Sequence, residues 1–175
     1  RKLLRSRLRA IYGAIKTDRP KPMRAALQLL AALVRHSSHV ARDLQLRFPF
    51  GMRSFKQLTE PRTGKNRQLL DGARSAFVDF ALSFLRSKSA EVQRETLNIP
   101  GLLESVARGL PHDSPDLCES TATALRDLVL LNDRIPARAR ARFFSSRLLE
   151  HLLRAYSDCA RDSDSALPPS VAGGG

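Results

Sequence analysis

The chain has 175 residues, of which 30 are Lys or Arg and 17 are Asp or Glu, so its formal net charge at pH 7 is +13. This length suits one domain with a substantial core and is short for two. A hydrophobic fraction of 42% and a charged fraction of 27% exclude fibrous and fully disordered classes. The basic balance favours a polyanionic partner, such as nucleic acid or an anionic membrane face.

The first predicted helix carries an apolar stripe at helical spacing, formed by Leu4, Leu8, Ile11 and Ile15. Arg5, Arg9 and Lys16 fall together on another side of this helix, so its second face is cationic. Pro20-Lys21-Pro22 then breaks the chain. A second helix, largely buried, is predicted to begin near Pro22 and to cover about residues 23–35.

A third helix is predicted over 38–47, ended by Phe48-Pro49-Phe50-Gly51, whose two Phe side chains we expect in the core. A brief helical piece at 52–58 leads into a polar, cationic loop at 60–67. The helix predicted for 69–86 carries Phe77, Phe80 and Phe84 on one side. This spacing favours core packing over a base-stacking platform.

Start signals mark the remaining helices. Ser89 can cap a short helix, and Pro100 can begin one that runs to about residue 108. Ser114-Pro115-Asp116 is the clearest start signal and opens a helix to about residue 132. Pro136 begins the last segment, whose predicted buried side consists of Phe143, Phe144, Leu148, Leu149, Leu152 and Tyr156.

No segment alternates polar and apolar residues between hairpin-type turns, so the predicted fold class is all-α. Helices joined by short Pro-marked turns, with pairs recurring every ~40 residues, favour a HEAT or armadillo-like α-solenoid segment. An irregular α-helical bundle is the alternative. We expect the repeat domain to span residues 1–157, with a disordered tail or linker at 158–175, and the whole to be a piece of a longer protein.

Catalytic signatures are absent from the sequence, which contains no GxGxxG, HExxH, CxxC or GxSxG pattern. His36 and His39 lack a nearby set of further ligands, and Cys118 and Cys159 are far apart. We therefore expect no enzyme, no metal site and no cofactor. The longest apolar runs are about half the roughly 20 residues that a membrane span requires, so no membrane partner is expected.

The excess charge is confined to the first part of the chain. Residues 1–67, the basic front, hold 17 Lys and Arg against 3 Asp and Glu, a net charge of +14. Cations on a helix face and in a loop can contact phosphates without reading base sequence. The predicted RNA-binding residues are Arg1, Lys2, Arg5, Arg9, Lys16, Lys21, Arg62, Lys65 and Arg67. The alternative is a HEAT-type protein-interaction module that binds an acidic partner without RNA.

Several strings, in order over most of residues 23–157, carry a family resemblance. They are Ala41-Arg42-Asp43, Phe48-Pro49-Phe50, the helix 77–85, Asn132-Asp133, Arg142-Phe143-Phe144-Ser145-Ser146-Arg147-Leu148-Leu149-Glu150-His151-Leu152, and Tyr156. Together they resemble the N-terminal region of the nucleolar pre-ribosomal-associated protein 1 family. Pro49 departs from this pattern, because the family usually has an acidic residue between the two Phe.

The resemblance implies a large, non-catalytic α-solenoid scaffold in the nucleolus of the nucleus. It implies a role in early assembly of the large ribosomal subunit precursor and in rRNA processing. The implied partners are pre-ribosomal RNA, large-subunit assembly factors including a DEAD-box RNA helicase, and the rest of the chain's own longer protein. On this reading the basic front contacts pre-ribosomal RNA.

Overall fold

The computed structural model describes residues 2–17, 19–48, 50, 53–144, 150, 152–154 and 156–157, without the side chains of residues 2–7, 53, 54 and 142. No strand occurs among these residues, so the all-α prediction is confirmed for the part of the chain described. The predicted tail at 158–175 lies outside the described part of the chain.

The helices are α1 (Lys2–Lys16), α2 (Pro20–His36), α3 (Ser38–Arg47), α4 (Arg53–Thr59), α5 (Arg67–Leu85), α6 (Ala90–Thr96), α7 (Leu102–Gly109), a 3₁₀ turn (Leu110–His112), α8 (Pro115–Leu125), a π-helical turn (Arg126–Leu130) and α9 (Ala137–Phe143).

The two predicted serine caps are present. The side-chain oxygens of Ser89 and Ser114 accept hydrogen bonds from the backbone N–H groups of Val92 and Leu117, each at 3.4 Å. These bonds satisfy N–H groups that have no partner within the first helical turn. The caps therefore set where α6 and α8 begin.

Three boundary or burial predictions were wrong. The second helix begins at Pro20 rather than near residue 22, because both prolines fit the first turn, where an N–H has no helical partner. Helix α7 begins at Leu102 rather than Pro100, since Gly101 precedes it at φ +78°, a left-handed conformation. Tyr156, predicted to be buried, is 76% exposed. Leu148 and Leu149 lie outside the described residues.

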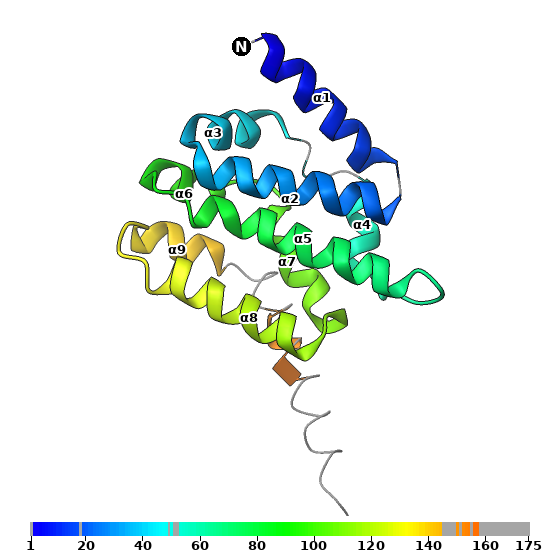
Figure 1. The fold of residues 1–175 in the computed structure, drawn as a ribbon. Coiled ribbons are helices and arrows are strands. Elements are labelled where there is room, and N and C mark those ends of the chain that lie inside the picture. Colours follow the sequence, from blue (N-terminus) through cyan, green and yellow to red (C-terminus); the bar gives the residue numbers. More distant parts are fainter. Residues whose placement is uncertain are drawn as a thin grey trace, which may run out of the picture.

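Three long helices lie side by side and run in the same direction (Figure 1). At their N-terminal ends the guanidinium of Arg24 on α2 lies over Gly72 of α5, and further along Arg35 pairs with Asp79 at 2.8 Å. Helix α8 continues the arrangement, because Arg74 on α5 meets Asp113 just before α8 begins. The N-terminal ends of α2, α5 and α8 therefore lie on one side of the molecule.

Helix α5 is the central element of the core. Its Phe77, Phe80 and Phe84 are fully buried, as the sequence predicts. Phe80 lies edge-on to Phe84 with ring centroids 5.2 Å apart, and Phe55 from α4 packs on Phe77 at 4.7 Å. Burial on this scale makes α5 the platform on which the other helices are placed.

Candidate nucleic-acid interface

Five of the nine predicted RNA-binding residues have exposed side chains in the structure. Arg9 and Lys16 lie on α1, Lys21 lies in the first turn of α2, and Lys65 and Arg67 lie at the start of α5. Arg1 and the side chains of Lys2 and Arg5 are outside the described part of the chain. The remaining residue, Arg62, is buried.

Three of these cations, Lys21, Lys65 and Arg67, lie where two helix N-termini meet, and Arg67 is 3.8 Å from Asp71. Because Arg24 lies over Gly72, the N-terminal halves of α2 and α5 are neighbours. Neither helix has an acidic residue in its first turn or a side-chain cap, whereas α8 has both, in Asp116 and Ser114. Helix N-termini carry partial positive charge, so this end of the structure adds the backbone field to that of Lys21, Lys65 and Arg67.

The sequence reasoning did not single out two further cations at this end. Arg19 and Arg24 are exposed and have no ion-pair partner among the residues that the structure describes. Arg19 immediately precedes α2, and Arg24 lies one turn into it. The charge count over residues 1–67 contained this signal, but it did not say which cations share a surface.

Other cations of the basic front are paired. Arg35 binds Asp79 at 2.8 Å, Arg42 binds Glu91, and Lys56 lies 3.4 Å from Glu60. Such exposed pairs contribute only about 0–1 kcal/mol to stability. They do neutralise much of the field that these cations would otherwise present to a polyanion.

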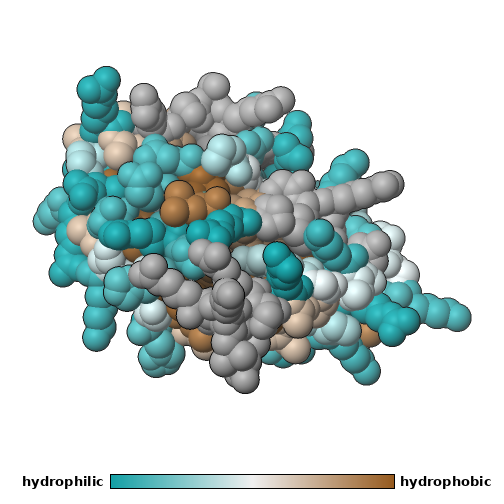
Figure 2. All heavy atoms as spheres, turned by 90° about the horizontal axis from the view of Figure 1, so that it is seen from above, coloured by the Kyte–Doolittle hydropathy of each residue, from teal (hydrophilic) through white to brown (hydrophobic). Residues whose placement is uncertain are grey.

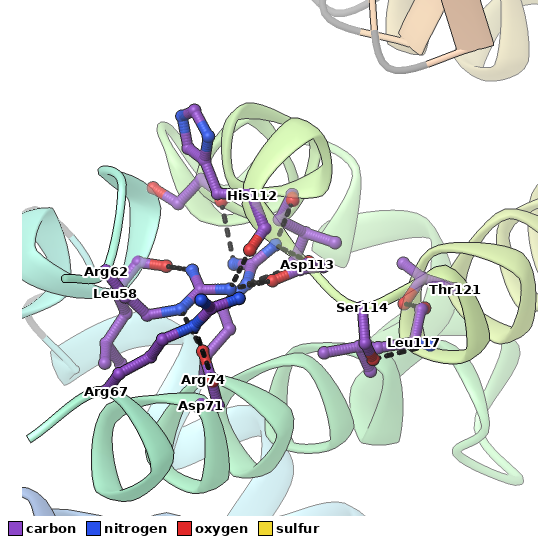
Figure 3. Close-up of polar contacts among 12 residues, drawn as sticks. Leu58, Arg62, Arg67, Asp71, Arg74, His112, Asp113, Ser114, Leu117 and Thr121 are labelled. Carbon is purple, nitrogen blue, oxygen red and sulfur yellow. Dashed lines mark hydrogen bonds and ion pairs between the residues drawn. The ribbon is translucent and has the colours of Figure 1, made fainter. Parts of the chain in front are cut away.

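The prediction that Arg62 binds RNA from a polar loop was wrong. Its side chain is 2% exposed, and its Nε donates to Asp71 at 2.6 Å while its Nη2 donates to Asp113 at 2.7 Å. The same guanidinium also donates to the carbonyls of Leu58 and His112 (Figure 3). With two carboxylates and two carbonyls bound and its side chain buried, Arg62 is not available to a phosphate, and it fixes the loop to the core.

Asp113 binds a second buried arginine. Arg74, whose side chain is fully buried, contacts Asp113 at 3.0 Å and donates to the carbonyls of Ser105 and Val106 in the middle of α7. Burial lowers the pKa of Arg74, and the neighbouring Asp113 opposes this shift. One buried carboxylate thus pairs with two guanidinium groups and joins the loop before α5, α5 itself and the turn that follows α7.

Gly109 is the residue that makes room for Arg74. A β-carbon built there would lie 2.5 Å from Nη2 and 2.8 Å from Nε of Arg74. We expect Gly109→Ala to lower the free energy of unfolding by about 1–3 kcal/mol, because the fixed guanidinium cannot withdraw. Urea denaturation followed by circular dichroism measures this. Gly13→Ala is the control, since nothing lies within 4 Å of its β-carbon, and it should stabilise by roughly 0.5–1 kcal/mol. Equal effects of the two substitutions would contradict the steric explanation.

Within the described part of the chain, no group of three or more His, Cys, Asp or Glu side chains is placed to hold a metal ion. His36 and His39 are both exposed. No helix of the described residues is both long enough and apolar enough to cross a bilayer.

The described structure is thus an all-α protein of stacked parallel helices with one cationic end. The family model described as "Ribosome 60S biogenesis N-terminal" (Npa1) matches residues 1–172. The chain belongs to this family, which confirms the resemblance seen in the sequence.

Two curated relatives carry the name "Nucleolar pre-ribosomal-associated protein 1". The chain is 25% identical to the protein from Homo sapiens and 23% identical to that from Mus musculus, in both cases over 158 residues and 90% of this chain. It spans 7% of the length of each relative. The names of both relatives agree with the predicted nucleolar localisation. No solved structure matches the chain significantly.

Proposed function

We propose that this chain is a segment of a non-catalytic nucleolar scaffold, which contacts pre-ribosomal RNA and assembly factors during early assembly of the large ribosomal subunit precursor. The observation that carries this proposal is the gathering of unpaired cations at the adjoining N-terminal ends of α2 and α5. The family description, which names 60S biogenesis, supplies the biological context. On this proposal the chain performs no chemistry and takes no cofactor.

The helical stack supports the scaffold role. Parallel neighbouring helices such as α2, α5 and α8 are typical of HEAT and armadillo-like solenoids, in which each unit contacts only its neighbours. We propose that residues 1–157 form such a segment, with the rest of the longer protein continuing the solenoid. Assembly factors, including a DEAD-box RNA helicase, would bind along the surface that this arrangement creates.

Binding of a large-subunit rRNA fragment at about 50 mM and about 200 mM salt tests the RNA contact. The triple variant Lys16→Glu, Lys21→Glu, Lys65→Glu should lower affinity roughly 100-fold at the lower salt and flatten the salt dependence, because each lost phosphate contact removes about 0.7–0.9 from the slope. The matched control is Lys88→Glu, Arg94→Glu, Arg134→Glu, which reverses three exposed cations outside the basic front.

If both triple variants lose affinity equally, the RNA contact is diffuse and the proposed interface is wrong. If the chain binds no RNA but retains assembly factors after nuclease treatment, the alternative of a protein-interaction module with an acidic partner replaces the RNA proposal.

A further inference from the structure

A small crevice lies between α1 and α3, away from the cations of the α2 and α5 ends. Leu8, Arg9 and Tyr12 line it from α1, and Asp43 and Arg47 line it from α3, around a volume of about 140 Å³. Figure 2, which looks onto the α1 and α3 side, shows an apolar area with hydrophilic side chains beside it. Both helices therefore supply one cation each to the rim of an apolar pocket.

Tyr12 has an unused hydrogen-bonding group in this crevice. Its ring packs edge-on against Phe48, with centroids 5.2 Å apart, so the orientation of the side chain is fixed. Its hydroxyl has no hydrogen-bond partner among the described residues, and it is not sealed from water. Burial raises the pKa of Tyr12, with a further rise from Asp43 and a fall from Arg47, so both charged groups lie near the phenol. The phenol is thus a protonated donor beside the two charged groups that line the crevice with it.

The charges of the crevice favour an anion. Arg9 is exposed and has no ion-pair partner among the described residues. Arg47 lies 3.8 Å from Asp43, which is too long for a hydrogen bond, and both of these side chains are partly exposed, at 53% and 39%. Two guanidinium groups against one carboxylate leave the crevice with net positive charge.

We propose that this crevice binds one phosphodiester group of RNA, whose oxygens accept hydrogen bonds from Arg9, Arg47 and the Tyr12 hydroxyl. The crevice, with a volume of about 140 Å³, has room for a phosphate group, and the donors that line it belong to two arginines and a tyrosine. The crevice therefore recognises the sugar-phosphate backbone of RNA and does not distinguish between bases. This proposal rests on the proposed function, since it adds a defined subsite to the RNA contact.

A polymer of phosphates fits the surroundings better than a single phosphorylated residue does. Arg9 and Lys16 are seven residues apart, so they lie on the same side of α1, about 10 Å apart along its axis. Lys16 in turn precedes the cations at the start of α2. A strand held in the crevice can therefore continue toward Lys21 and Lys65, where a phosphopeptide would have no second phosphate to offer.

Fluorescence anisotropy with a labelled oligouridylate of about ten nucleotides tests the subsite on the full chain. Tyr12→Phe keeps the ring on Phe48 and removes only the hydroxyl, so affinity should fall about 5- to 10-fold with unchanged urea denaturation. Arg47→Ala should lower affinity about 10-fold and reduce the salt slope by about 0.7. Asp43→Asn should instead raise affinity about 2- to 5-fold, because it removes the one repulsive charge. Arg94→Ala, an exposed cation on α6, is the control and should change neither quantity.

The outcomes separate the subsite from the function. If the Lys16, Lys21, Lys65 triple variant loses RNA while Tyr12→Phe, Arg47→Ala and Asp43→Asn all match the control, the crevice proposal is wrong and the proposed function stands. A loss of affinity in Asp43→Asn also overturns the phosphate assignment, since the carboxylate would then accept a hydrogen bond from the ligand.

If the unmodified chain binds no oligouridylate or rRNA fragment, the proposed function fails. Tyr12-dependent binding of a phosphoserine peptide in its place would assign the crevice to a protein ligand.

Discussion

Replacing Asp113 by alanine is expected to lower the free energy of unfolding by about 3–5 kcal/mol. The side chain of Asp113 is fully buried and accepts from Arg62 at 2.7 Å and from Arg74 at 3.0 Å. Its removal leaves Arg74 with carbonyl partners alone, in a site where burial already disfavours the charged guanidinium. The loss amounts to about a fifth or more of the stability of a typical domain, which is about 5–15 kcal/mol. Urea denaturation followed by circular dichroism measures it.

Asp79→Ala is the matched control for this substitution. Asp79 also accepts from two arginines, Arg35 at 2.8 Å and Arg86 at 3.1 Å, but its side chain is 40% exposed. Water can replace both partners, so the expected loss is at most about 1 kcal/mol. Adding Arg74→Met to Asp113→Ala should recover part of the loss, because the uncompensated charge is then gone. Similar losses for the two aspartates would show that burial does not set the energy of the Asp113 network.

Local signals in the sequence predict the helices well because they act within one turn. Ser89 and Ser114 cap the helices that follow them, and Phe77, Phe80 and Phe84 fall on the buried side of α5, as their spacing indicates. Errors at the helix starts arise where two residues compete for the same role. Pro20 and Pro22 can both occupy a first turn, and Gly101 caps α7, which begins at Leu102 and not at Pro100.

The sequence could not predict that the side chain of Arg62 is buried. Its position in a polar loop beside Lys65 and Arg67 is typical of a solvated cation. The carboxylate that buries it, Asp113, lies 51 residues further along the chain, and only the stacking of α8 beside α5 brings the two together. Local charge patterns therefore indicate the sign of a surface, while tertiary packing decides which of its charges remain exposed.

The sequence did not predict the crevice between α1 and α3, for a related reason. Arg9 was expected to bind RNA, but Tyr12 and Arg47 were not, because nothing in the local pattern relates α1 to α3. Phe48 connects the two helices. It directly follows α3, and its ring contacts Tyr12 on α1. The placement of the α1 cations thus depends on an aromatic contact with the core.

Phe48→Ala is therefore expected to lower the free energy of unfolding by about 3–5 kcal/mol and to loosen α1 in particular. Phe48 is 5% exposed, and its ring lies 5.2 Å from both Tyr12 and Phe80 and 5.9 Å from Phe55. Its removal opens a cavity where α1, α4 and α5 meet. Amide hydrogen exchange should show a larger loss of protection in α1 than in α5, because α5 keeps its other buried neighbours.

Phe48→Leu fills most of the same space and serves as the control, with an expected loss of about 1–2 kcal/mol. It should retain exchange protection in α1 and the affinity for RNA, whereas Phe48→Ala should weaken RNA binding, because Arg9 and Lys16 are held in place by the docking of α1. Equal loss of protection in α1 and α5 would show that Leu8 and Ile15, both buried against the core, are sufficient to dock α1 without Phe48. In that case the link between the aromatic core and the cationic face would be absent, and the RNA affinity of Phe48→Ala at a temperature where it remains folded would equal that of the unmodified chain.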